Sequence, residues 1–102
     1  MKAIFSENKQ QLDDLCKKLK VERLYAFGSS LTENFTSESD VDFLFSFSSD
    51  LSLEEYFENY FQFHEALEKM LGRSVDLTAE YTLSNPYLIE TIDRTKALLY
   101  EG

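Results

Sequence analysis

The sequence has little cysteine, glycine and proline, and one long stretch of it has no basic residue. Cys16 is the only cysteine among 102 residues, so no disulfide can form within the chain and we expect a reducing compartment. Three Gly and one Pro leave no flexible linker, and we find no internal repeat, which favours a single domain over residues 1–102. No apolar run approaches the roughly 20 residues that cross a bilayer, and no secretory signal pattern opens the sequence. We therefore expect a cytoplasmic protein without a membrane segment.

Basic residues are outnumbered by acidic ones, 10 to 19, which gives a formal net charge of -9. No Lys or Arg occurs between Arg23 and Lys69. Such a surface repels phosphate backbones and lacks the counterion release that dominates the binding of nucleic acids. We therefore expect no tight binding of nucleic acid. The acidic stretch is either a solvated surface or a place that attracts metal cations.

Hydrophobic periodicity and capping signals predict that helices and strands alternate. Helices are predicted near residues 7–19, from Ser52 to about 71 and near 86–94, and strands at 21–27, 41–47, 74–80 and 97–100. Ser52 with Glu55 forms a capping box, Gly72 is a stop signal, and Asn85 followed by Pro86 predicts a helix start. The predicted fold is α/β (α+β), a small mixed sheet of three to four strands with helices packed on it.

The long helix has more aromatic residues than one buried stripe needs. Its predicted stripe consists of Leu53, Phe57, Tyr60, His64, Leu67 and Leu71. Some of the aromatic side chains should therefore be exposed. An exposed patch of them would be a candidate protein interface, and the alternative is that the aromatic residues serve simple core packing. We expect His64 to be a partly buried histidine with its hydrogen bonds satisfied rather than a metal ligand, and Cys16 to lie in the core.

Gly28, Ser29 and Ser30 stand where the first strand gives way to a turn. Glycine lets a phosphate approach the main chain, and exposed N–H groups with a serine hydroxyl can bind phosphate oxygens. A Gly-Ser pair also occurs in ordinary turns. We consider these residues candidates for phosphate binding because of the carboxylates that follow.

Asp40 and Asp42 stand two residues apart at the start of a strand, so their side chains point to the same side. Hard oxygen ligands of this kind suit magnesium or manganese. The alternative is that they are polar residues at a strand entrance. Asp76 lies in the middle of the third predicted strand, where burial is costly unless a charge is paired or metal-bound. If the second and third strands are neighbours, the three carboxylates line one cleft.

The run FGSSLTENFTSESDVDFLF (residues 27–45) resembles the signature of the minimal nucleotidyltransferases of the DNA polymerase beta superfamily. That signature is Gly-Ser, a spacer of about ten residues, Asp-x-Asp and a third aspartate on a later strand. Residues 73–102 are also similar to the small bacterial proteins of this group. The resemblance therefore covers nearly the whole chain.

The resemblance implies a palm-like domain in which Gly28 and Ser29, with Ser30 beside them, hold the triphosphate of ATP or another nucleoside triphosphate. It implies that Asp40 and Asp42 bind two Mg²⁺ (or Mn²⁺) ions, about 3.5 to 4 Å apart in such sites, and that Asp76 completes the shell of the catalytic ion. The implied reaction transfers a nucleoside monophosphate, AMP in the first instance, to a hydroxyl. Asp76 is then the candidate base for the hydroxyl proton.

The sequence departs from the family pattern at Ser30, where many relatives carry a basic residue, and residues 31–39 contain no base. The triphosphate charge must then be balanced by metals, main-chain N–H groups or the later residues Arg73, Arg94 and Lys96. Small members of the family are often encoded beside a HEPN-type partner, act as its antitoxin, and in some cases adenylylate a tyrosine of it. We therefore expect a protein partner or a homodimer to complete the acceptor site. The alternative is a catalytically weak or inactive binding module that neutralises its partner by occlusion.

Overall fold

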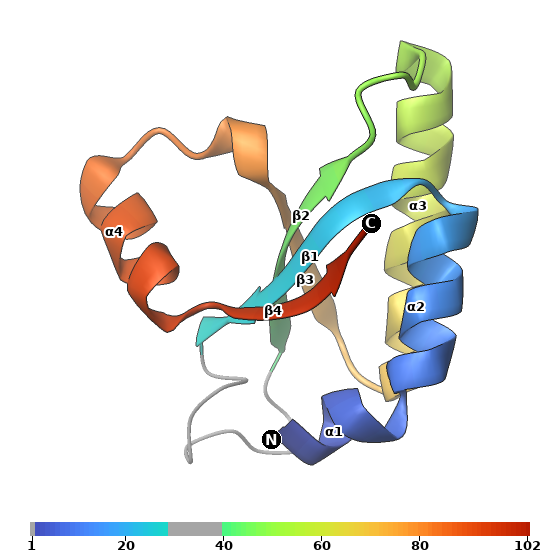
Figure 1. Cartoon of the computed structure of the whole chain (residues 1–102), viewed down its shortest axis with the longest axis horizontal. Helices are drawn as coiled ribbons and strands as arrows, with labels where there is room; N and C mark the ends of the chain where they lie inside the picture. The colour runs from blue at the N-terminus through green and yellow to red at the C-terminus, as the bar shows by residue number, and fades with distance from the viewer. Residues whose placement is uncertain (1, 29–39) are drawn as a thin grey trace.

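A four-stranded mixed sheet forms the centre of the structure, a computed structural model that describes residues 2–28 and 40–102 (Figure 1). The strands are β1 (Val21–Phe27), β2 (Val41–Phe47), β3 (Val75–Ala79) and β4 (Ala97–Glu101), in the spatial order β3-β2-β1-β4. β1 is antiparallel to β2 and β4, whereas β2 is parallel to β3. All four predicted strands are confirmed, and so is the predicted α/β fold with a small mixed sheet.

β2 lies inside the sheet because its residues are apolar on both faces. Phe43 and Phe45 point to one face and belong to the main hydrophobic core, with 0% and 1% of their surfaces exposed. Leu44 points to the opposite face and is 1% exposed, although it lies outside that core cluster. Both faces of the sheet are therefore covered over its central strand.

Helices lie on both faces of the sheet, as Figure 1 shows. α2 (Lys9–Lys18) and α3 (Leu53–Leu71) cover one face, where the rings of Phe45 and Phe63 pack edge to face with centroids 6.3 Å apart. α4 (Pro86–Thr95) lies on the other side and follows a short 3-10 segment, η2 (Glu80–Thr82). Within residues 2–28 and 40–102, no helix is both long and apolar enough to cross a membrane.

The helix predicted near residues 7–19 is confirmed as α2, but the sequence did not predict the short helix that precedes it. The structure has two helices there, α1 (Lys2–Glu7) and α2, which meet at Asn8. Asn8 is the N-cap residue of α2, and its side chain makes no capping hydrogen bond. The apolar spacing used for the prediction marks α2 alone, in which Leu12 and Cys16 are buried.

The predicted caps of α3 and α4 are confirmed. Ser52 Oγ accepts a hydrogen bond from the Glu55 N–H, and the Glu55 carboxylate accepts one from the Ser52 N–H, both at 3.2 Å. Gly72 ends α3 with a φ of +68°, in the left-handed region that favours glycine. Asn85 caps the start of α4, and Pro86 is its first residue. Local sequence signals therefore fix the ends of both helices.

The buried stripe predicted for α3 is partly wrong. Leu53 is 73% exposed and Phe57 is 52% exposed, whereas Phe63 and Leu67 are fully buried against the sheet. Apolar residues occupy more of this helix than one stripe needs, so periodicity alone could not decide which arc faces the core. The prediction that some of its aromatic side chains are exposed is confirmed.

Candidate functional site

Gly28 ends β1 directly against Asp42. Its φ is +73°, a conformation that residues with a side chain rarely adopt. Its neighbour Phe27 pairs with Asp42 across β1 and β2, and a Cβ atom built on Gly28 would lie 2.5 Å from Asp42 Oδ2. The sequence predicts a turn at this glycine, but only the strand pairing shows that an aspartate leaves no room for a side chain there.

Asp42 and Asp76 are opposite each other on the parallel strands β2 and β3. Side chains of residues in register point to the same face, so the structure brings these two carboxylates together as the sequence predicted for neighbouring strands. The expected burial of Asp76 is wrong, because β3 is an edge strand and Asp76 is exposed. Asp42, on the inner strand, is partly buried.

The carboxyl group of Asp42 has a pKa above its ordinary value. Burial is the largest cause, and the negative charges of Asp76 and then Asp40 add to it. The three aspartates are therefore close enough for their charges to interact, with Asp42 at the centre. Holding Asp42 ionised costs free energy that a cation nearby would offset.

The aspartates do not form a ready-made cage for a metal. Among the described residues, no group of three or more His, Cys, Asp or Glu side chains lies close enough together to hold an ion. The structure supplies the adjacent pair Asp42 and Asp76, with Asp40 exposed at the entrance to β2. Ser29 and Ser30, the other two residues predicted to bind phosphate, lie outside the described residues.

Lys96 packs over the face of the sheet that carries Asp42. Tyr25 neighbours Leu44 across β1 and β2, so its side chain is on the Asp42 face, two pairs along from Asp42 itself. Lys96 Nζ lies 4.2 Å from the centroid of the Tyr25 ring and 3.0 Å from Asp93 Oδ1. The side chain of Lys96 is only 23% exposed. A positively charged group is thus held over the same face of the sheet as Asp42.

Arg94 and Arg73 are placed differently. Arg94 is on α4, its side chain is 72% exposed, and it pairs with Glu90 at 3.4 Å. Arg73 lies between α3 and β3, next to Ser74, whose carbonyl accepts a hydrogen bond from the Val41 N–H at 3.0 Å. Arg73 is therefore at the end of the sheet where Asp40 enters β2.

His64 and Cys16 lie outside the site, as predicted. His64 Nε2 is 2.9 Å from the carbonyl oxygen of Val75, so the partly buried ring donates a hydrogen bond to the main chain. Cys16 is fully buried in the core. Neither side chain is therefore a candidate for the chemistry of the aspartates.

Comparison with known proteins identifies relatives over most of the chain. The family model described as "Nucleotidyltransferase domain" matches residues 8–98. The Methanocaldococcus jannaschii protein named "Putative protein adenylyltransferase MJ1379" is 36% identical over 93 residues, which cover 91% of this chain and 88% of that protein. A second protein of that organism, named "Putative protein adenylyltransferase MJ0128", is 32% identical over 79 residues, which cover 78% of this chain and 76% of that protein.

Solved structures share the fold. A structure described as a "putative minimal nucleotidyltransferase" superposes with a TM-score of 0.70 at 27% identity, covering 90% of this chain and 89% of that one. A toxin-antitoxin crystal structure with AMP-PNP gives a TM-score of 0.68 at 21% identity, covering 93% and 74%. A tri-AMPylated Shewanella oneidensis HEPN toxin in complex with its MNT antitoxin gives 0.63 at 19% identity, covering 96% and 73%.

These likenesses confirm the predicted polymerase-beta-like fold of the minimal nucleotidyltransferases. The family model spans nearly the whole chain, and the two sequence relatives match it at more than 30% identity. Since the match includes the segments that carry Gly28, Asp42 and Asp76, the chain belongs to the nucleotidyltransferase domain family.

Proposed function

We propose that this protein is a metal-dependent nucleotidyltransferase that transfers AMP from ATP to a hydroxyl of a partner protein or a small molecule. The observation that carries the proposal is the register of Asp42 with Asp76 beside Gly28, where main chain and carboxylates meet without a side chain between them. The names of the M. jannaschii relatives support the adenylyl group and the protein acceptor.

The residues of the site fit divalent cations. All the candidate ligands are carboxylate oxygens, the donors that Mg²⁺ and Mn²⁺ prefer, and Asp76 is open to solvent. Burial, and then the charges of Asp76 and Asp40, raise the pKa of Asp42, so its ionised form carries a free-energy cost that a bound cation would offset. We propose that Asp40, Asp42 and Asp76 hold two such ions. Bound there, the ions would act as Lewis acids that stabilise negative charge on phosphate oxygens.

The chain itself would position the reactants. Gly28 lets the triphosphate approach the main chain, and Ser29 and Ser30 follow it in sequence as candidates for phosphate binding. The acceptor oxygen would attack the α-phosphorus. The bond between the α-phosphorus and the oxygen that bridges to the β-phosphate would break, and pyrophosphate would leave with the electron pair of that bond. Asp76 would take the proton from the acceptor hydroxyl, because its exposed carboxylate is the one that an incoming acceptor can reach.

We further propose that the protein is the antitoxin of a HEPN/MNT pair and that its acceptor is a hydroxyl of the HEPN-type partner. Structures of toxin-antitoxin complexes share this fold, and one of them holds an AMPylated toxin.

The test is label transfer from ATP labelled in the α-phosphate, with magnesium and a candidate HEPN-type partner protein. We expect the wild type to label the partner and Asp42→Ala to abolish transfer, because the substitution removes the central carboxylate. Asp50→Asn is the matched control, since Asp50 is an exposed aspartate that bonds Ser48 beyond the far end of β2. Transfer by Asp42→Ala at the wild-type rate would refute the proposed mechanism.

The alternative is a binding module that neutralises its partner by occlusion, without turnover. The absence of a basic residue from position 24 to 68 favours it, as does the absence of a three-ligand group among the described residues. A stable complex that inhibits the partner, with no label transferred at any metal concentration, would select this alternative. Inhibition that requires ATP and is lost in Asp42→Ala would select the enzyme.

A further inference from the structure

An exposed aromatic groove runs between α3 and the edge strand β3, away from the aspartates. It has a volume of about 390 Å³, and its lining includes the aromatic residues Phe57, Phe61 and Tyr81 and the strand residues Leu77 and Ala79. Phe57 is 52% exposed, Phe61 67% and Tyr81 77%. Exposed phenylalanines gathered in one groove are unusual for a surface that faces only water.

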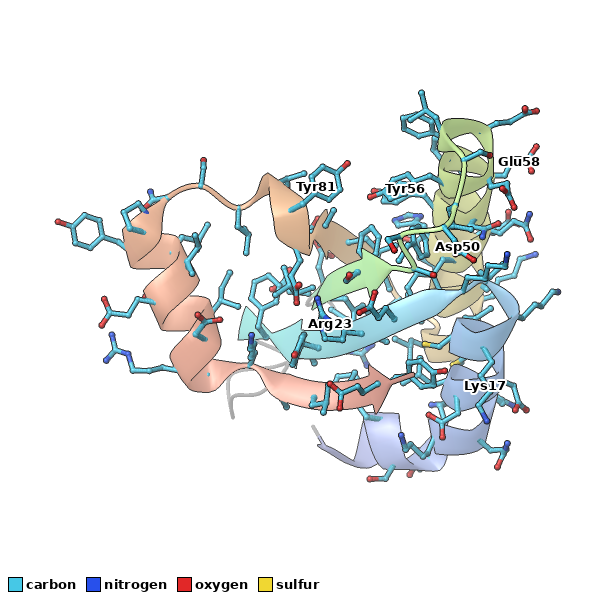
Figure 2. All side chains as sticks on the ribbon, turned by 45° about the horizontal axis from the view of Figure 1, so that its top comes forward. Lys17, Arg23, Asp50, Tyr56, Glu58 and Tyr81 are labelled. Atoms are coloured by element: carbon cyan, nitrogen blue, oxygen red, sulfur yellow. The ribbon has the colours of Figure 1, made fainter. Side chains whose placement is uncertain are left out.

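The rings of the groove are held in place by their neighbours. Phe57 packs edge to face on Tyr56 with centroids 5.8 Å apart, and Phe61 packs in the same way on Tyr60 at 5.4 Å. Tyr56 of α3 and Tyr81 of η2 point toward each other (Figure 2), with ring centroids 6.2 Å apart in an edge-to-face arrangement. A ligand would therefore meet a largely preformed surface.

One edge of the groove is a strand edge that is blocked at its beginning and at its last carbonyl, where Ala79 accepts a hydrogen bond from Thr82 Oγ1 at 2.7 Å. Val75 donates its N–H to the Glu68 carboxylate and accepts from His64 at its carbonyl, at 3.0 and 2.9 Å. Alternate residues of a strand direct their main-chain groups to the same side, so Leu77 and Ala79 direct theirs to the side of β3 away from β2. Within the described part of the chain no strand pairs there. An exposed strand edge of this kind is a template for another strand.

The charges around the groove select the occupant. Helix spacing of three or four residues places Glu54 beside Phe57 and Glu58 beside Phe61, and none of the groove-lining residues is basic. Glu65 is also beside Phe61 but is paired with Lys69 at 3.1 Å. A second copy of this chain would bring the same carboxylates against them. A partner whose apolar residues alternate with Lys or Arg would instead match both the rings and the charges.

We propose that this groove binds an extended, basic segment of a partner protein, which adds to the sheet as a strand beside β3. Its apolar side chains would pack on Phe57 and Phe61. Because the side chains of a strand alternate, the residues between them would face the side of the sheet that carries Asp42 and Asp76. The segment would thus lead from the groove toward the candidate active site. The docking itself requires no nucleotide chemistry and holds whether or not the protein is an enzyme.

The test uses a fluorescein-labelled nonapeptide of alternating valine and lysine, titrated with the full chain at low salt and followed by fluorescence anisotropy. We expect saturable binding that the double substitution Phe57→Ser with Phe61→Ser weakens by about tenfold or more. Leu98→Ser is the matched control, because Leu98 is 52% exposed on β4, the opposite edge strand, and should leave binding unchanged. Circular dichroism of each variant would establish that it is folded.

Two modified peptides test the geometry. Methylation of alternate main-chain nitrogens removes the donors of one strand edge and should abolish binding if they face β3, and replacing lysine by glutamate should abolish it by repulsion. Equal binding by the double variant and the wild type would overturn the proposal, as would equal binding of glutamate and lysine peptides. A homodimer in sedimentation velocity that the double variant loses would show that a second copy is the occupant, which would also overturn it.

Discussion

Replacing Gly28 by alanine should impair transfer far more than it impairs folding. The φ of +73° alone costs a residue with a Cβ atom about 1–2 kcal/mol. The new Cβ would also lie 2.5 Å from Asp42 Oδ2, below the 3.0 Å that such contacts essentially always keep. The carboxylate must therefore move by roughly half an ångström or more, and an off-rotamer side chain costs about 0.5–1.5 kcal/mol. We expect a loss of about 2–3 kcal/mol in the free energy of unfolding.

The effect on activity should be larger because Asp42 is the central carboxylate of the site. A displacement of about 1 Å in a reacting group can reduce a rate by about 100-fold. Label transfer to the HEPN-type partner measures this loss, and urea denaturation measures stability. Gly72→Ala is the matched control, since Gly72 has a φ of +68° and a Cβ there would meet nothing within 4 Å. It should show the conformational cost alone and transfer label at the wild-type rate.

A double-mutant cycle isolates the contact with Asp42. In the Asp42→Ala background the clash disappears, so Gly28→Ala should then lower the free energy of unfolding by no more than Gly72→Ala does. The reasoning would be refuted if Gly28→Ala transferred label at the wild-type rate. It would also be refuted if Gly28→Ala lowered the free energy of unfolding equally with and without the Asp42 carboxylate.

Three further predictions concern charge and burial. Asp42→Asn should abolish transfer yet raise the urea midpoint at pH 7. Because the pKa of Asp42 is raised in the folded protein, the stability of the wild type falls as the pH rises through that pKa, and the variant should lack this part of the pH dependence. An unchanged urea midpoint would contradict the expected direction of the effect. Lys96→Met should weaken ATP binding, measured by calorimetry, by about tenfold and should weaken AMP binding less. Arg94→Met, at the exposed end of α4, should change the binding of neither nucleotide. Equal effects of the two substitutions would exclude Lys96 as a phosphate contact. Cys16 should react with a thiol reagent only on unfolding, because burial raises its pKa to about 12, and rapid modification of the native protein would contradict its burial.

Local sequence determined the elements and their ends. Capping residues such as Ser52, Gly72 and Asn85 act through neighbouring main-chain groups, so their roles could be read without a fold. The apolar run of β2 likewise indicated an inner strand, because only such a strand needs apolar residues on both faces. The spacing of Gly28, Asp40 and Asp42 also indicated the family, which the family match then showed.

Tertiary structure decided what depends on contacts between distant segments. The register of β2 and β3 placed Asp76 opposite Asp42 and left it exposed, because β3 is an edge strand and not the sheet centre that its sequence suggested. Packing on the sheet also decided which arc of α3 is buried, and it left Phe57 in an open groove. Neither outcome follows from local periodicity, since the partner of each surface lies far away in the chain.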